Sequence, residues 1–313
     1  MPPGQSEAAV PYTKAQVRRL MVQMYLPWRR WFGERPVERS VQGVRLTLPW
    51  SHMLPDYARV SPQYGQNLVE LAAGLGAALD GPLPVLDIGA NIGDSALQIA
   101  ARTDARVLCV EADAHWVDYL RRNLGDDPRF AVETVLITPD DVSVVAPTAV
   151  RHHGTTHFVE HGAATGQATA TVSQVRDRHP DFAALRLVKS DTDGFDTALV
   201  PAVLAAWSAS RPVAFFEYDP GLTRAAGNDP AAIWAELAEL GYRDLAIWDN
   251  AGDPLGRLDI ERAADEARVL EPKPLQYGYH FWDVAVRHQD DTVAAEVFDA
   301  LVPMPYSVHG TWR

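Results

Sequence analysis

The chain has 313 residues, 47% of them hydrophobic, which is enough apolar material for one large core or a core with an appendage. Its 41 acidic and 28 basic residues give a formal net charge of -13, which would repel a phosphate backbone and excludes nucleic acid as the expected partner. A single cysteine, Cys109, excludes an intrachain disulfide. No apolar run reaches the ~20 residues that a membrane span needs, and charges interrupt every candidate signal peptide, so we expect a cytoplasmic protein.

The first 80 residues are expected to form a helical extension or lid ahead of a main domain at 81–313. Residues 1–50 carry eight Lys/Arg against three Glu, the reverse of the balance in the whole chain. Apolar residues recur at helical spacing from Tyr12 to about Phe32, and a second helix is expected from Pro62 to about Leu79. The aromatic and basic first helix favours a lid or a contact between two copies of the chain, a homodimer, over a membrane-surface helix.

Beyond residue 80, apolar strands alternate with helices. Strands are predicted at 85–88, 106–110, 130–137, 185–189, 213–217, 244–248 and 281–286, and helices at 94–102, 116–124, 197–206, 230–240 and 291–301. This alternation predicts βαβ units, and the continuous apolar runs indicate strands of a parallel sheet covered on both faces. Residues 138–172 break the rhythm and predict short extended pieces and loops at one edge.

A glycine-containing turn follows the first of these strands, in V-L-D-I-G-A-N-I-G at 85–93. Gly89 and Gly93 let the backbone bend sharply and approach a ligand closely. A dinucleotide site needs G-x-G-x-x-G, and this turn lacks that spacing. Asp87, two residues before the first glycine, would repel a diphosphate but suits a ligand with an ammonium group, held directly or through water.

Glu111 ends the second strand, where a carboxylate can accept both ribose hydroxyls of an adenosine. Because the same position serves NAD, Glu111 discriminates only in combination with Asp87 and the G-x-x-x-G spacing. Together they predict S-adenosylmethionine as the cofactor. The residues expected to bind it are Asp87, Gly89, Asn91, Gly93, Glu111 and Ala112.

A second motif follows the fourth strand, in K-S-D-T-D-G-F-D at 189–196. Methyl transfer to a hydroxyl is helped by a base that takes the proton during attack. Asp191 is our first choice for this base and Asp193 the second, with His280 near the last strand as an alternative base or acceptor contact. Lys189 is expected mainly to neutralise the acidic cluster.

A divalent metal site is the alternative role for these acids. Glu217 and Asp219 follow the fifth strand, and with Asp191 they could bind Mg²⁺, which prefers carboxylates plus substrate oxygens. Such an ion would lower the pKa of the acceptor hydroxyl.

These motifs resemble those of the FkbM-type methyltransferases. The likeness lies in residues 85–93, Glu111, K-x-D-x-x-G-F at 189–195 and F-F-E at 215–217, and it extends more loosely over residues 45–290. Family members usually carry Glu where this chain has Asp193. The resemblance implies a class I Rossmann-like α/β fold, with a mostly parallel seven-stranded sheet whose last strand is antiparallel. It also implies O-methylation of a hydroxyl on a sugar, a polyketide-type secondary metabolite or a surface glycan.

Two other functions fit the same fold class. An NAD-linked sugar oxidoreductase is disfavoured by the missing G-x-G-x-x-G and by the lack of an obvious Tyr-x-x-x-Lys pair. A non-catalytic protein that binds S-adenosylmethionine is disfavoured by the intact acidic cluster, which such a protein has no need to keep.

Overall fold

The computed structural model describes residues 33–142, 148–152, 155–159, 168–265 and 281–306. The helix predicted within residues 12–32 therefore lies outside the described residues, as does His280. No helix in the described part of the chain is both long and apolar enough to cross a lipid bilayer.

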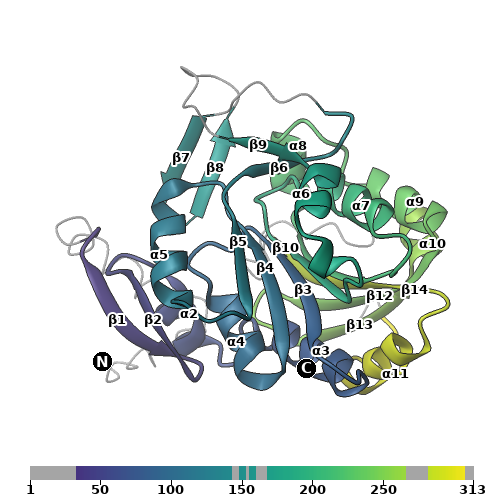
Figure 1. Cartoon of the computed structure of the whole chain (residues 1–313). Coiled ribbons are helices and arrows are strands. Elements are labelled where there is room, and N and C mark those ends of the chain that lie inside the picture. Colours follow the sequence, from purple (N-terminus) through teal and green to yellow (C-terminus); the bar gives the residue numbers. More distant parts are fainter. Residues whose placement is uncertain (1–32, 143–147, 153–154, 160–167, 266–280, 307–313) are drawn as a thin grey trace, which may run out of the picture.

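A large sheet occupies the centre of the molecule (Figure 1). Its eight strands follow the order β13-β12-β14-β11-β10-β3-β4-β5. Their bounds are β3 Leu83–Ile88, β4 Ala105–Val110, β5 Phe130–Glu133, β10 Leu187–Ser190, β11 Val213–Tyr218, β12 Tyr242–Asp249, β13 Pro254–Asp259 and β14 Trp282–His288.

The direction of the strands confirms the predicted fold class. Strands β5, β4, β3, β10 and β11 are parallel neighbours, whereas β14 is antiparallel to both β11 and β12. A parallel sheet with one antiparallel strand between its last two members is the class I Rossmann-like methyltransferase arrangement. The chain order reverses between β3 and β10, and open α/β sheets bind ligands beyond the strand ends at such a switch point.

The prediction missed the eighth strand, β13, which pairs with β12 at the edge of the sheet and on its other side makes only an isolated bridge between Arg257 and Pro305 among the described residues. Its sequence, P-L-G-R-L-D, alternates between exposed and buried positions and contains Pro254 and Gly256. Edge strands tolerate such residues because one side of the strand needs no partner, so a continuous apolar run is absent.

Helices cover both faces of the sheet, and successive residues of each strand point into two separate cores. On one face, Leu86 and Ile88 of β3 join a core covered by helices α6, α7, α9 and α10, which lie together in Figure 1. On the other face, Val85 joins a core with α3, α4 and α11. This second core contains the fully buried Cys109.

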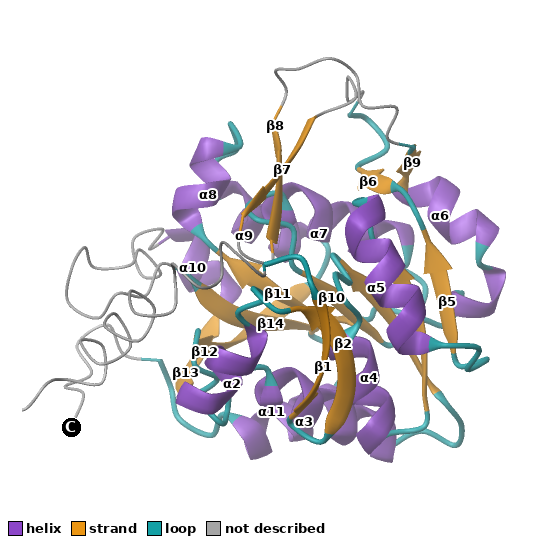
Figure 2. Cartoon of the chain, turned by 90° about the vertical axis from the view of Figure 1, so that its left-hand side faces the viewer, coloured by secondary structure: helices purple, strands orange, loops and turns teal. Residues whose placement is uncertain are grey.

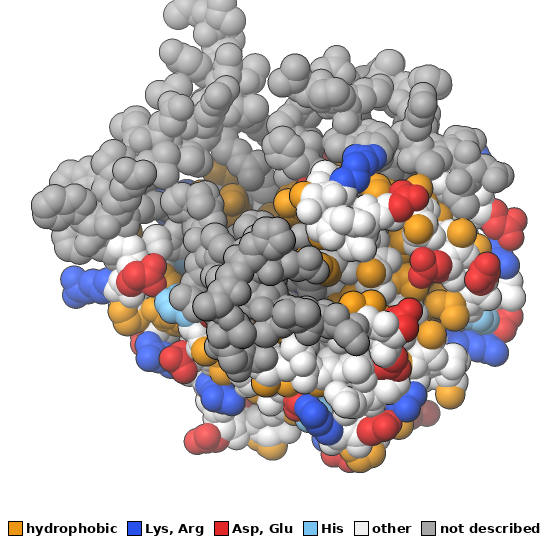
Figure 3. Space-filling view, turned by 90° about the horizontal axis from the view of Figure 1, so that it is seen from above, with side chains coloured by type: hydrophobic (Ala, Val, Ile, Leu, Met, Phe, Trp, Pro, Cys, Tyr) orange, Lys and Arg blue, Asp and Glu red, His pale blue; other side chains and the backbone are white. Residues whose placement is uncertain are grey.

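The helices of the described chain are short. Their bounds are α2 Leu54–Val60, α3 Gln66–Ala77, α4 Asp94–Arg102, α5 Ala114–Leu124, α6 Val172–Arg178, α7 Asp196–Ala206, α8 Pro220–Ala225, α9 Ala232–Glu239, α10 Ile260–Asp265 and α11 Thr292–Leu301, with a 3₁₀ turn at Pro180–Phe182. Figure 3 shows charged side chains of both signs around the described rim of the face seen from above, with apolar side chains between them.

The expected N-terminal extension contains a β-hairpin that the sequence analysis did not predict. Strands β1 (Pro36–Val41) and β2 (Val44–Pro49) are joined by Gln42 and Gly43, which both have positive φ, as a two-residue hairpin turn requires. The hairpin packs beside α5 (Figure 2), where its apolar side chains share a small core with Trp116. The second expected helix is present as α3. The domain boundary at residue 80 stays a prediction.

The segment between residues 130 and 172 leaves the main sheet. The predicted strand at 130–137 is divided into β5 and a short β6 (Leu136–Thr138), which pairs with β9 (Thr169–Thr171). Between β6 and β9 in the sequence, β7 (Thr148–His152) and β8 (Thr155–Val159) form a separate hairpin. The expectation of short extended pieces here is confirmed.

Asn123 of α5 attaches the N-terminal hairpin to this helix and to the turn after β3. Its side chain accepts from the Thr47 amide at 2.7 Å and donates to the carbonyls of Thr47 and Ile92. Replacing it in Asn123→Ala leaves three backbone groups without this partner, so we expect the free energy of unfolding to fall by about 1–3 kcal/mol. Urea unfolding measures this loss. Asp118→Ala, at an exposed position of the same helix, is the control, and an equal loss in both variants would contradict the prediction.

Candidate functional site

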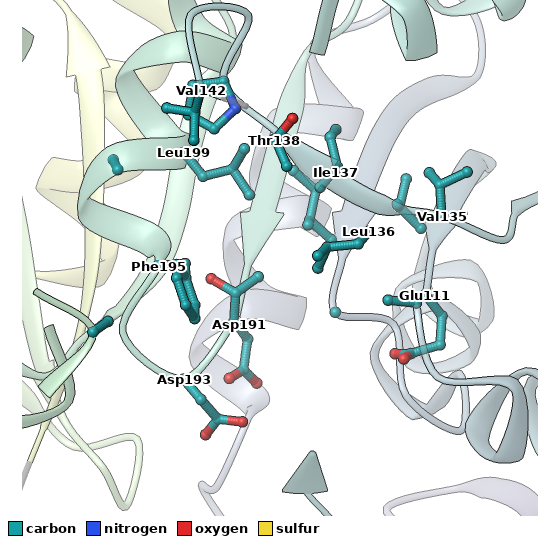
Figure 4. Close-up of a pocket in the computed structure, with 18 of the residues that line it drawn as sticks. Glu111, Val135, Leu136, Ile137, Thr138, Val142, Asp191, Asp193, Phe195 and Leu199 are labelled. Carbon is teal, nitrogen blue, oxygen red and sulfur yellow. The ribbon is translucent and has the colours of Figure 1, made fainter. Parts of the chain in front are cut away.

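A cavity of about 300 Å³ lies at the carboxyl ends of β3, β4 and β10. Figure 4 shows Glu111 at one end of it, Asp191 and Asp193 in the middle, and Phe195, Leu199 and Val142 toward the other end. Its volume is at the lower end of the range of small-molecule sites.

Four of the six residues predicted to bind the cofactor line this cavity. They are Gly89, Asn91, Glu111 and Ala112. Asp87 and Gly93 do not line it. The two residues predicted as bases, Asp191 and Asp193, both do.

The turn after β3 is held against the loop after β10 by a very close backbone contact. Gly89 has φ of 72°, and a Cβ built on it would lie 2.0 Å from the carbonyl oxygen of Asp191. Gly93 also has a positive φ, but its Cβ would meet the Leu120 side chain at 2.8 Å. Gly89 is thus required where two site loops meet, whereas Gly93 is required where α4 begins against α5.

Glu111 is the buried carboxylate of the cavity, with 6% of its surface exposed. Its Oε2 accepts from the amide of Asn91 and its Oε1 from the amide of Asp113, each at 2.8 Å. A carboxylate oxygen can accept more than one hydrogen bond, so both oxygens retain acceptor capacity. Burial raises the pKa of Glu111 to about 7, although the two amides oppose the shift.

Asp87 lies in the sheet itself and is completely buried. The ammonium group nearest to it in the structure is that of Lys189, whose Nζ lies 3.1 Å from Asp87 Oδ1. Burial raises the pKa of Asp87 and Lys189 opposes that rise. The role of Asp87 as a ligand for the cofactor stays a prediction, since the cavity does not reach it.

The motif after β10 divides into two kinds of acid. Asp196 is buried and accepts from the Ser190 hydroxyl at 2.6 Å and from the Thr192 amide, so it holds the loop in shape. The Asp191 side chain is 49% exposed and faces the cavity. Asp193 has a left-handed backbone with φ of 52°, and burial, followed by the charges of Asp191 and Asp196, raises its pKa to about 7.

The structure does not support the predicted magnesium ligands Asp191, Glu217 and Asp219. Asp219 begins α8, where its Oδ1 accepts from the amides of Gly221 and Leu222 at 2.7 and 2.9 Å. A carboxylate before a proline is a common way to start a helix, and this use was overlooked. In the described part of the chain, no three His, Cys, Asp or Glu side chains gather in a way that could hold a metal ion.

The sequence analysis missed a further set of polar side chains, which comes from the N-terminal extension and the last strands of the sheet. Asp283 of β14 lies opposite Glu217 of β11 and accepts from the Asn67 amide group at 2.8 Å. Burial raises the pKa of Asp283 to about 7 and raises that of Glu217 well above its usual value. The pKa of Tyr64 is raised, first by burial and then by the charges of Asp191 and Asp283. The sequence offered only a loose family likeness at Tyr64 and Asp283.

The apolar wall of the cavity was also missed, because its residues come from distant segments. It is formed by side chains of the segment around β6 and of α7 and the loop before it, namely Val135, Leu136, Ile137, Val142, Phe195 and Leu199. Phe195 and Val142 are 40% and 45% exposed, which is unusual for large apolar side chains. Trp116 both lines the cavity and is buried.

Neither a protein-family model nor a curated protein sequence matches this chain. Membership of the FkbM family therefore stays a prediction.

Several solved structures are similar to it at low identity. A SAM-dependent methyltransferase from Agrobacterium tumefaciens is 12% identical over 81% of this chain and 70% of its own, with a TM-score of 0.43. Magnesium protoporphyrin IX methyltransferase from Synechocystis PCC 6803 with bound SAM is 15% identical over 90% and 99%, with a TM-score of 0.39. Precorrin-6y C5,15-methyltransferase from Geobacter metallireducens is 12% identical over 71% and 86%, with a TM-score of 0.38. Since these scores lie below 0.5, the fold is assigned from the strand order alone.

Substitution at Gly89 tests the contact between the two site loops. In Gly89→Ala the new Cβ meets the Asp191 carbonyl and the positive φ becomes strained, so we expect a loss of at least about 2 kcal/mol in the free energy of unfolding. Gly81→Ala is the matched control, because a Cβ there meets nothing within 4 Å. Denaturant unfolding compares them, and a Gly89→Ala protein as stable as the control would show that this contact is not rigid.

Proposed function

We propose that this chain is an S-adenosylmethionine-dependent methyltransferase that acts on a hydroxyl group of a small molecule or glycan. The observation that carries the proposal is a single cavity at the strand ends, with the Gly89 turn on one wall and the Glu111 carboxylate on another. The NAD-linked alternative has no comparable support, because the turn lacks the glycine spacing of a dinucleotide site.

The residues of the cavity fit the three parts of this cofactor. Glu111 has acceptor capacity left on both oxygens, which suits the two hydroxyls of a ribose. The apolar wall around Leu136 and Phe195 suits a flat adenine ring. The Gly89 turn and Asp191 lie where the amino-acid part would be held. When bound, S-adenosylmethionine supplies an activated methyl group.

Asp191 is the side chain we propose as the base. It is the most exposed of the three cavity carboxylates and can reach a hydroxyl placed in the cavity. Burial raises the pKa of Asp193 to about 7, which suits a general base, so Asp193 stays the second candidate only because its side chain is less exposed than that of Asp191. Asp191 would hold the acceptor hydroxyl and take its proton as the new carbon–oxygen bond forms. The O-methylation itself is proposed from the family likeness.

Glu111→Gln tests the cofactor site. The neutral side chain keeps the shape but loses charge-assisted hydrogen bonds to the ribose, so we expect affinity for S-adenosylhomocysteine to fall by about 10- to 100-fold. Calorimetric titration measures it, with NAD as a comparison ligand. Glu70→Gln, at an exposed position of α3, should bind like the native protein.

The same titration has an expected pH dependence. Ribose hydroxyls donate to ionised Glu111, so bound cofactor lowers a pKa that is about 7 in the free protein. Affinity should therefore be fully present above pH 7 and fall as the pH drops below it, up to about tenfold per unit. Glu111→Gln should lack this dependence. A native protein that binds NAD but not S-adenosylhomocysteine would overturn the proposal.

Asp191→Asn tests the proposed base. With labelled S-adenosylmethionine at saturation, we expect label to enter members of a panel of sugars, polyketides and glycans that bear hydroxyls. The Asn variant should transfer it about 10²- to 10⁴-fold more slowly, because its amide cannot take the proton. Asp193→Asn is the comparison, and a larger loss there would move the role of base to Asp193. Label found only on nitrogen would contradict O-methylation.

A further inference from the structure

A charged pair is buried in the middle of the sheet, beside the candidate site. Asp87 of β3 and Lys189 of β10 are direct neighbours in the strand register, and both side chains are buried. The next residues in the same row are Cys109 of β4 and Phe215 of β11, which are also buried. The pair thus lies in an apolar row, where removing two charges from water is costly.

The negative charge of the buried Asp87 side chain is compensated by Lys189. Its Oδ1 lies 3.1 Å from the Lys189 ammonium, and its Oδ2 has no hydrogen-bond partner within the described residues. Two apolar side chains could fill this row at similar or better stability. Stability alone therefore does not explain the pair.

Lys189 makes more contacts than neutralising Asp87 requires. Its Nζ donates to the carbonyl of Gly89 at 2.9 Å and lies 3.7 Å from Asp191 Oδ2. Burial by itself would lower the pKa of Lys189, but the carboxylates of Asp87, Asp191 and Asp94 outweigh burial and raise it. The side chain therefore remains an ammonium, with its donors directed at both loops that border the cavity.

We infer that Lys189 is a positioning residue that joins the Gly89 turn to the Asp191 loop and so shapes the amino-acid end of the cofactor site. Asp87 in turn fixes Lys189. This inference rests on the proposed function. It changes the role expected for Asp87, which acts through Lys189 instead of contacting the cofactor. It also gives Lys189 a role beyond the neutralisation of the acidic cluster, which is what the sequence analysis expected.

The arrangement predicts an effect on one half of the cofactor only. Gly89 and Asp191 line the cavity, whereas Lys189 and Asp87 do not. Glu111 is held by the amides of Asn91 and Asp113, and the charge of Lys189 is the smallest of the named influences on its pKa, which it lowers. Removing the ammonium should therefore weaken binding of the amino-acid part and leave adenosine binding largely intact.

Two probes separate these halves in calorimetric titrations. S-adenosylhomocysteine carries the amino-acid part, and 5′-methylthioadenosine lacks it. In Lys189→Met we expect affinity for the first to fall at least about tenfold, as for a lost charge-assisted contact, and affinity for the second to change less than about twofold. A merely structural role would weaken both probes alike. Arg102→Met, at an exposed helix position, is the control.

The double variant Asp87→Asn/Lys189→Met covers the case in which the single variant fails to fold, because it leaves no uncompensated buried carboxylate. We expect its Tm to exceed that of Lys189→Met while its affinity for S-adenosylhomocysteine stays at least tenfold below the native value. A double variant that binds S-adenosylhomocysteine like the native protein would overturn the inference, since Lys189 would then only neutralise Asp87. A native protein that binds neither probe would instead overturn the proposed function.

Discussion

The structure depends on the close approach of two parallel strand ends, those of β3 and β10. The turn after β3 passes so near the Asp191 carbonyl that only glycine fits at position 89. Two residues earlier on each strand, Lys189 is paired with Asp87 across the sheet and donates to the Gly89 carbonyl. This contact occurs at the switch point of the sheet, so the geometry of the cavity is set by the backbone before any ligand arrives.

Burial makes the site less negative than the number of its acidic side chains suggests. Glu111, Asp193 and Asp283 all have a pKa raised to about 7, chiefly by burial, and burial also raises the pKa of Glu217 well above its usual value. Near neutral pH the cluster is therefore less negative than its composition implies. Protonation of some of these carboxylates reduces the repulsion between the acids that share this sheet edge in the described chain.

Local patterns predicted the core of the fold well. The continuous apolar runs of β3, β4 and β10 need cover on both faces, and they lie as predicted in the parallel sheet. Patterns were ambiguous where a residue also serves a local structural purpose. Asp219, predicted as a metal ligand, caps helix α8, and Gly93, predicted at the cofactor, has a φ and a close contact that the start of α4 requires. The cofactor role of Gly93 stays a prediction. The N-terminal hairpin was missed although β2, V-R-L-T-L-P, alternates apolar and polar residues in the pattern of a half-buried strand.

The sequence by itself determined which strand ends carry the candidate site, since Gly89, Glu111 and Asp191 each follow a short apolar run typical of a buried strand. Only the tertiary structure decided which groups meet. It placed Lys189 against Asp87 across the strand register, and it brought Tyr64 and Asp283 into the electrostatic surroundings of Asp191. These contacts join residues about 100 or more positions apart, and no local spacing encodes them, because strand order and register fix them only when the whole sheet forms.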